Sequence, residues 1–342
     1  MRFLVIGGTG FIGPFLVHEL ERRGHCVAVF HRGQSAPAFP VNVQHILGDR
    51  RNLGAHAAAL QRFAPDVVID MILSSRGQAE ALVATFRGVA RRVVVLSSVD
   101  VYRACGVLHG TEPGPLEPVP LTEDSPLRTR PPYPPQALER LQGTFAWVDD
   151  DYDKVPVERV ALGCPVLPGT VLRLPMVYGP GDRLHRLYPL LKRMDDGRKR
   201  ILLADEMAAW RGPRGYVENV ARAVARAATS PRAAGRVYNV AEEPPYTELE
   251  WAKLVAARVG WHGAFRVLPR ERMPEHLRVP GNLLQHWSAS SRRIRTELRY
   301  REPVSVGEAL RRTIVWERAN PPADTDPKQF NYAAEDAADP AP

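Results

Sequence analysis

Three glycines near the start of the chain have the spacing of a phosphate-binding turn. Gly7, Gly10 and Gly13 follow the apolar run Phe3–Ile6 and directly precede an amphipathic segment. A strand that ends in such a turn and continues into a helix lets backbone N–H groups at the helix start approach a pyrophosphate. The strand-like run before the glycines and the helix-like run after them make the motif specific. The segment predicts a dinucleotide site formed by Gly7, Gly10, Phe11, Ile12 and Gly13.

The end of the second predicted strand indicates which dinucleotide would bind. An acid about twenty residues past the glycines would bind the adenine ribose hydroxyls of NAD. The sequence there is Phe30-His31-Arg32-Gly33 and has no carboxylate. Arg32, helped by His31, is suited to pair with a 2′-phosphate, although it is also readable as an ordinary solvent-facing arginine. We therefore expect NADP, with NAD as the alternative.

Asp49 follows the third predicted strand, in Gly48-Asp49-Arg50-Arg51. Its carboxylate is a candidate acceptor for the adenine amino group. A helix-capping role explains the residue almost as well.

The first half of the chain alternates strand-like and helix-like runs. Strands are expected at Phe3–Ile6, Cys26–Phe30, Val43–Leu47, Asp66–Ile69 and Arg92–Leu96, and helices at Ile12–Arg23, His56–Phe63 and Gln78–Val89. Such alternation predicts a Rossmann-like, doubly wound parallel sheet, an α/β fold with a smaller C-terminal α/β substrate lobe. Further helices are expected at Lys154–Leu162, Asp182–Met194 and Val217–Thr229.

Domain boundaries follow from these elements. We expect residues 1–180 with 212–241 to form the NAD(P)-binding Rossmann domain, and 181–211 with 242–319 to form the substrate lobe. Residues 320–342 are rich in Pro, Ala and acids, so we expect a mostly disordered tail. Residues 103–149 are rich in Pro, Glu and Gly and read as a long loop over the carboxyl edge of the sheet.

Composition narrows the class of protein. Among the 342 residues, 44% are hydrophobic and 25% charged, as in soluble globular proteins. We expect a cytoplasmic protein without a membrane span, because no apolar run reaches the roughly 18 residues required. The three cysteines are far apart and lack metal-ligand spacing, so no metal is expected. The net charge of +8 is scattered among acids, which suits a solvated surface or phosphate-bearing small molecules about as well as nucleic acid. We expect a small-molecule partner and no nucleic acid.

Four further motifs occur in order along the chain: Val94–Tyr102, Leu121–Arg128, Val171–Gly181 and Arg214–Val220. Together with the glycine turn they resemble the extended short-chain dehydrogenase/reductase superfamily, its NAD(P)-dependent epimerase/dehydratase group, over nearly the whole chain. The resemblance implies oxidoreduction, epimerisation or dehydration at a secondary alcohol or ketone of a sugar-like or nucleotide-linked substrate. It also implies a homodimer, and Arg214 as the residue that holds a substrate phosphate. A structural ion pair is the other interpretation of Arg214.

The resemblance further implies a Ser or Thr, a Tyr, and a Lys four residues after the Tyr, one helical turn along. Ser98 falls on the first position. Lys154 matches the lysine, which in the family also holds the nicotinamide ribose. Four residues before Lys154 stands Asp150 rather than a tyrosine, whereas Tyr152 is only two residues away.

Pro156 predicts how Tyr152 reaches the site. Proline is tolerated in the first turn of a helix but not in its interior. The helix is therefore expected to begin near Asp153, with Asp151 or Asp153 as its N-cap and Tyr152 on a non-helical lead-in.

Three interpretations of the chemistry remain open. Tyr152 acts as acid/base from the lead-in; or Asp150 or Asp100 transfers the proton; or the site binds NADP without redox chemistry. Asp100 is attractive because it lies two residues past Ser98, where dehydratases of the family carry an acid. Tyr133 is a further candidate phenol. The sequence also leaves two other functions open, that of a regulatory NADP-binding protein and that of an RNA-associated relative.

Overall fold

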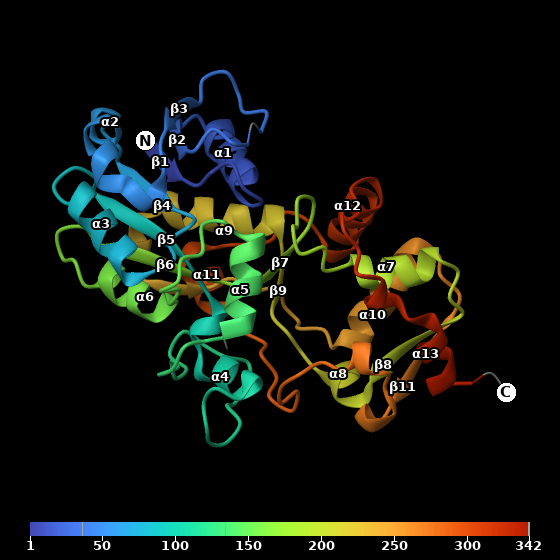
Figure 1. The fold of residues 1–342 in the computed structure, drawn as a ribbon. Coiled ribbons are helices and arrows are strands. Elements are labelled where there is room, and N and C mark those ends of the chain that lie inside the picture. Colours follow the sequence, from blue (N-terminus) through green and yellow to red (C-terminus); the bar gives the residue numbers. More distant parts are fainter. Residues whose placement is uncertain (36, 134, 341–342) are drawn as a thin grey trace.

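The computed structural model describes residues 1–35, 37–133 and 135–340 (Figure 1). Seven strands, all paired in parallel, form the central sheet in the order β10-β6-β5-β4-β1-β2-β3. This confirms the Rossmann-like fold. The strands are β1 (Arg2–Ile6), β2 (Cys26–His31), β3 (Gln44–Leu47), β4 (Val67–Asp70), β5 (Arg92–Ser98), β6 (Gly169–Leu174) and β10 (Val237–Asn239).

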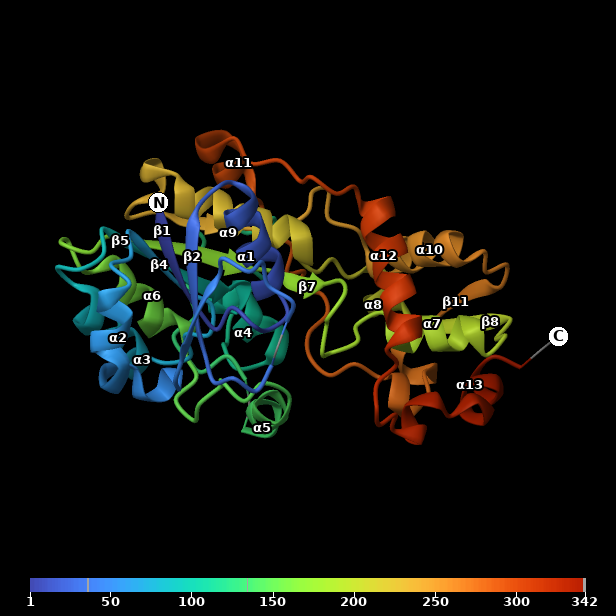
Figure 2. The same ribbon diagram turned by 90° about the horizontal axis from the view of Figure 1, so that it is seen from above.

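Helices cover both faces of this sheet (Figure 2). On one face lie α1 (Gly13–Arg22) and α9 (Val217–Thr229); on the other lie α2 (Ala57–Arg62), α3 (Arg76–Phe86) and α6 (Lys154–Leu162). The pleat of β1 explains the two cores, because Phe3 and Val5 pack on the α1 side whereas Leu4 and Ile6 pack on the α3 side.

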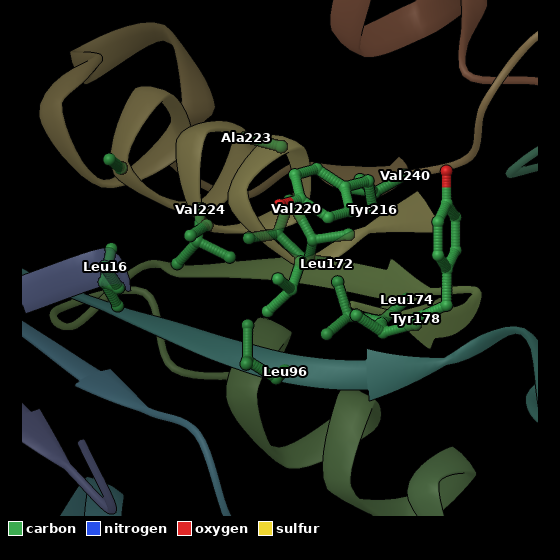
Figure 3. Close-up of a cluster of buried hydrophobic side chains, with 14 of the residues drawn as sticks. Leu16, Leu96, Leu172, Leu174, Tyr178, Tyr216, Val220, Ala223, Val224 and Val240 are labelled. Atoms are coloured by element: carbon green, nitrogen blue, oxygen red, sulfur yellow. The ribbon is translucent and has the colours of Figure 1, made fainter. Parts of the chain in front are cut away.

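Helix α9 has a strong apolar stripe that faces the sheet. Figure 3 shows Val220 and Val224 of this helix pointing toward Leu172 of β6, with Leu96 of β5 beside it. The four side chains are buried. This packing fixes β5 and β6, and with them the strand ends that carry the candidate chemistry.

A second group of elements lies beside the sheet domain (Figure 1). It contains α7 (Tyr188–Asp195), β8 (Arg200–Ala204), α8 (Asp205–Ala209), α10 (Glu248–Val259), β11 (Ala264–Leu268) and α12 (Val306–Ala319). β8 pairs with β11, and at the junction β7 (Met176–Tyr178) pairs with β9 (Arg214–Tyr216). Thr247 and Glu250 form a capping box at the start of α10.

The structure corrects three sequence-based expectations about individual elements. The helix expected at 182–194 begins only at Tyr188. Residues 103–149 contain two helices, α4 (Arg103–His109) and α5 (Pro135–Thr144). Helix α11 (Arg292–Leu298), expected in the substrate lobe, packs against β10 and α9. The domain boundaries otherwise stay a prediction.

The C-terminal segment also differs from the disordered tail that we expected for 320–342. It contains a short turn of 3₁₀ helix at Pro327–Phe330 and helix α13 (Tyr332–Ala338). Buried Glu335 pairs with Arg193 of α7 at 2.7 Å, and Asp339 pairs with Arg200 at 3.2 Å. Ion pairs with residues far away in the sequence hold this segment in place. The composition of the segment does not reveal these partners, and for that reason it indicated disorder.

None of the helices in the described part of the chain is both long and apolar enough to cross a lipid bilayer.

Candidate active site

A cavity of about 370 Å³ opens where β1, β2, β4 and β5 end. This is the carboxyl edge of the sheet, where ligands bind in open α/β folds. It brings together most of the residues predicted from the sequence: Gly7, Gly10, Phe11, Ile12, Gly13, His31, Arg32, Asp49, Ser98, Asp100, Tyr152 and Lys154. Asp150 and Arg214 do not line it.

The glycine turn has the geometry that a bound diphosphate needs. Gly7 has φ +80°, which glycine adopts without strain. A side chain at Gly13 would collide with the carbonyl of Gly8, whereas a side chain at Gly10 would project into open space. Ile12, the N-cap of α1, supplies no side-chain hydrogen bond, and the first turn holds no acid. The start of α1 therefore leaves N–H donors and room for an anion, so these residues fit a dinucleotide.

Arg32 stands exposed at the outer end of the cavity. Among the described residues its side chain makes no hydrogen bond or ion pair within the usual distances. His31 is engaged differently from what we expected, because its Nδ1 accepts from Gly33 N (3.1 Å) and its Nε2 lies 2.8 Å from Nδ1 of His45. Burial and the neighbouring His45 lower the pKa of His31, so the ring adds no positive charge beside Arg32 at neutral pH.

Asp49 caps the short 3₁₀ helix at Arg50–His56 and pairs with Arg51 at 3.0 Å. This agrees with the capping interpretation. Arg51 also lines the cavity and was not singled out from the sequence.

Asp100 and Tyr152 meet in the inner part of the cavity. The Tyr152 hydroxyl donates to Oδ2 of Asp100 at 2.9 Å, whereas Oδ1 accepts no hydrogen bond from the described residues. Asp100 is 1% exposed. Burial raises the pKa of this carboxyl above its usual range, against the opposing charges of Arg128 and Lys154. Burial and the charge of Asp100 also raise the pKa of Tyr152, so its phenol is neutral at physiological pH.

Lys154 is buried and its ammonium does not contact the Tyr152 hydroxyl. It donates to the carbonyls of Leu73 and Leu96, the latter at 3.2 Å, and lies 5.1 Å from the centre of the Trp147 ring. Burial lowers the pKa of Lys154 to about 8, even though Asp100 nearby acts in the opposite direction. The amine therefore retains its charge near neutral pH but loses it under mildly alkaline conditions.

Ser98 ends β5 and faces the cavity. Its hydroxyl accepts from the backbone N–H of Asp100 at 3.2 Å, and so caps the 3₁₀ turn at Val99–Val101. That turn is what directs the Asp100 side chain into the cavity.

The lead-in to α6 is anchored on both sides of Tyr152. The carboxylate of Asp149 accepts from the hydroxyls of Ser74 (2.7 Å) and Ser75 (2.8 Å). Asp153 accepts from Val155 N at 2.9 Å as the helix N-cap. The predicted helix start, one of the two predicted caps and the non-helical Tyr152 are therefore all found in the structure.

Two predicted site residues lie elsewhere. Asp150 is exposed and accepts from Gln142 at 2.9 Å, so its carboxylate does not reach the cavity. Arg214 pairs with Glu248 and lies over the ring of Trp251 at 4.7 Å, which agrees with the ion-pair interpretation. The described residues contain no group of three or more His, Cys, Asp or Glu side chains that could hold a metal ion.

Sequence reasoning missed an apolar wall of the cavity. It comes from the end of α5 and the loop that follows: Leu141, Phe145, Ala146, Trp147 and Val148. The aromatic pair Phe145 and Trp147, shortly before the Asp149–Lys154 segment, was a signal that could have been used.

Comparison with known proteins identifies the family. The model of the NAD dependent epimerase/dehydratase family matches residues 3–241. The chain belongs to this family. The extended short-chain dehydrogenase/reductase resemblance is thereby confirmed, and the chain is a member of a family of NAD(P)-dependent enzymes.

Individual relatives of this family member are distant. The 2′-dehydrokanamycin reductase of Streptomyces kanamyceticus is 30% identical over 141 residues, or 41% of this chain; the chain spans about a third (36%) of that relative's length. The 3-diazoavenalumate denitrifying reductase of a Streptomyces species is 27% identical over 76% of this chain and 82% of its own. UDP-glucose 4-epimerase of Thermotoga maritima, solved with UDP-glucose, has a TM-score of 0.65 and 18% identity over 93% of this chain and 99% of its own.

Proposed function

We propose that this protein is an NADP-dependent enzyme of the epimerase, dehydratase or reductase type that acts on a secondary alcohol or ketone of a sugar-like substrate. One observation carries the proposal: a single cavity joins the phosphate-binding turn at Gly7–Gly13 to Ser98, Asp100, Tyr152 and Lys154. A regulatory NADP-binding protein would need the phosphate-binding turn but not the four polar side chains beside it.

NADP is proposed over NAD because of the charges at the outer end of the cavity. Arg32 and Arg51 line this end, and no acid follows β2. Arginine forks recognise a phosphate through charge-assisted hydrogen bonds. Asp49 already pairs with Arg51, so Arg32 is the main candidate for contact with a 2′-phosphate. NAD remains the alternative.

For proton transfer we propose a pair made of Tyr152 and Asp100. A bound nicotinamide supplies the hydride donor or acceptor. When an alcohol is oxidised, its hydroxyl proton passes to the Tyr152 oxygen while the Tyr152 proton passes to Oδ2 of Asp100 over the existing 2.9 Å hydrogen bond. Reduction of a ketone reverses both transfers. The raised pKa of Asp100 suits this role, because it makes the carboxylate a better proton acceptor.

Ser98 and Lys154 support this pair. The Ser98 hydroxyl faces the cavity and is suited to hold the reacting oxygen of the substrate. Lys154 has two of its three N–H groups committed to backbone carbonyls and keeps one for a ribose hydroxyl. Its charge also favours the ionised form of Asp100.

The relatives support a carbohydrate-like substrate. One relative is named as a 2′-dehydrokanamycin reductase, and one structural neighbour is a UDP-glucose 4-epimerase that was solved with UDP-glucose. A nucleotide-linked sugar is the finer form of this proposal. Neither the regulatory nor the RNA-associated alternative is favoured by the comparisons. The homodimer and the cytoplasmic location stay predictions.

The experiment that tests the proposal has two stages. Thermal shift with NADPH and NADH is measured first, and stabilisation by NADPH is expected. NADPH oxidation is then followed with a panel of keto-sugars and nucleotide-linked keto-sugars, and conversion of the corresponding sugars is followed by mass spectrometry and NMR, because an epimerase or dehydratase returns the hydride and leaves the cofactor unchanged overall. Absence of any cofactor-dependent shift would overturn the cofactor assignment, whereas cofactor binding without turnover of any panel member would favour a binding-only protein.

A further inference from the structure

A second phenol reaches the same carboxylate as Tyr152. The Tyr133 hydroxyl donates to Oδ2 of Asp100 at 3.2 Å, so that one oxygen accepts from two tyrosines while Oδ1 accepts from none of the described residues. The two tyrosine rings lie 6.3 Å apart. Both side chains line the cavity, as does Asp100.

Tyr133 is delivered by a chain segment that is fastened to the backbone around Asp100. Arg128 is the main anchor. Its backbone N–H donates to Val101 O at 2.8 Å, its Nε donates to the backbone carbonyl of Asp100 at 2.9 Å, and its Nη2 bonds Asp153 at 2.6 Å. A single guanidinium thus joins the Asp100 turn, the N-cap of α6 and the segment that leads to Tyr133.

Glu112 secures the same segment from the other side. Its carboxylate accepts from the backbone N–H of Arg130 at 2.8 Å. The ring of Tyr133 also packs on His109, with 5.6 Å between ring centres. Tyr133 is therefore held in place by contacts on each side, although it belongs to a Pro-rich connection.

We propose that Tyr133 is a positioning residue for Asp100: together with Tyr152 it holds Oδ2, and it thereby fixes the orientation of the carboxylate that exchanges a proton with Tyr152. The proposal rests on the proposed function, in which Asp100 exchanges a proton with Tyr152. It gives Tyr133, which also lines the cavity, an indirect part in the chemistry through the orientation of Asp100.

Two phenol donors on one oxygen have a chemical consequence. They stabilise the carboxylate and leave the acid form without that stabilisation, because a hydrogen bond to the charged form favours ionisation. The charged and titratable groups around Asp100 are Arg128, Lys154, Tyr133, Tyr152, Cys105 and His109. Loss of the Tyr133 hydroxyl removes one of the influences that lower the pKa of Asp100.

The test uses full-length Tyr133→Phe, which keeps the ring that packs on His109. The protein is labelled with ¹³C at the aspartate carboxyl carbon, and the Asp100 resonance is identified by its absence in Asp100→Asn. In Tyr133→Phe the Asp100 titration is expected to move to higher pH by about half a unit or more. Tyr332→Phe is the matched control, because it also removes a phenol bonded to an aspartate, Asp196, but in the C-terminal segment.

A kinetic measurement completes the test. With the best keto-sugar substrate, the acid limb of the kcat/KM profile of Tyr133→Phe should shift in the same direction, and NADPH binding should be unchanged. An unchanged Asp100 resonance overturns the proposal whatever the turnover. If the Asp100 resonance shifts in Tyr133→Phe but the wild-type protein turns over no substrate, the positioning role is supported and the proposed function has failed. Failure of the positioning proposal and failure of the proposed function are therefore distinguishable.

Discussion

The hydroxyl of Tyr152 is directed at Oδ2 of Asp100, 2.9 Å away, and not at the ammonium of Lys154 two residues along the chain. The Lys154 ammonium lies over the Tyr152 ring, 5.6 Å from its centre, and donates to backbone carbonyls instead of to the hydroxyl. The Tyr152 hydroxyl thus hydrogen-bonds a carboxylate, where the family pattern would place the ammonium of the lysine beside it. The proposed proton transfer through Asp100 is based on that exchange of partners.

Substitutions of Tyr152, Asp100 and Asp150 should show which of these residues takes part in proton transfer. Tyr152→Phe and Asp100→Asn are each expected to lower kcat by roughly a hundredfold to ten-thousandfold, because each breaks the same proton path. Asp150→Asn is the control and should keep wild-type activity, since its carboxylate is exposed and bonds only Gln142 among the described residues. Steady-state kinetics measure these effects. A large loss of kcat in Asp150→Asn would instead favour Asp150 as the residue that transfers the proton.

Arg32→Ala should weaken NADPH binding about tenfold to a hundredfold and leave NADH binding nearly unchanged. The expected loss is that of a charge-assisted hydrogen bond to the 2′-phosphate. Calorimetric titration of both cofactors measures it. Arg76→Ala is a suitable control, because Arg76 is an exposed arginine that pairs with Glu80 on α3. Equal weakening of NADPH and NADH in Arg32→Ala would contradict the NADP assignment.

The buried amine of Lys154 should make stability depend on alkaline pH. Its pKa is about 8 in the folded state and has its ordinary value of 10.5 in the unfolded state. Between these values the unfolded chain binds more protons, so the free energy of unfolding rises with pH by up to about 3 kcal/mol. Urea unfolding of wild type and Lys154→Met from about pH 7.5 to about pH 10 tests this. The wild type should gain stability relative to the variant, and parallel curves would contradict the shifted pKa.

The C-terminal helix should contribute to stability through its buried carboxylate. Glu335 is 1% exposed and pairs with Arg193, which is also buried. Glu335→Ala leaves the guanidinium buried without its partner and is expected to cost about 3–5 kcal/mol. Arg318→Ala breaks the exposed pair with Asp195 and should cost less than about 1 kcal/mol. Denaturant unfolding compares the two, and similar small losses would indicate that α13 is loosely attached.

Much of the fold could be predicted because its signals are local. The glycine turn, the boundaries of α9 and the start of α6 each follow from a few neighbouring residues, such as Pro156 in the first turn of α6. Ser98, Asp100, Tyr152 and Lys154 were all brought to one cavity as the sequence indicated.

What could not be predicted depends on partners that are distant in the sequence. The hydrogen bond of Tyr133 to Asp100 spans 33 positions and depends on Arg128, whose role no local pattern reveals. The ordered C-terminal helix depends on Arg193, 142 positions before Glu335. The role of Arg214 at a substrate phosphate came from resemblance alone and stays a prediction: its Nη2 pairs with Glu248, whereas its Nη1 has no hydrogen-bond partner among the described residues.

The path of the chain between the sheet domain and the second group of elements limits how the protein can be divided. The chain leaves the sheet domain through β7, returns through β9, leaves again after β10, returns for α11 and ends in α12 and α13 (Figures 1 and 2). No single cut therefore yields either part as one continuous fragment. An engineer who wishes to exchange the second group of elements for that of another protein would have to replace several separate segments together.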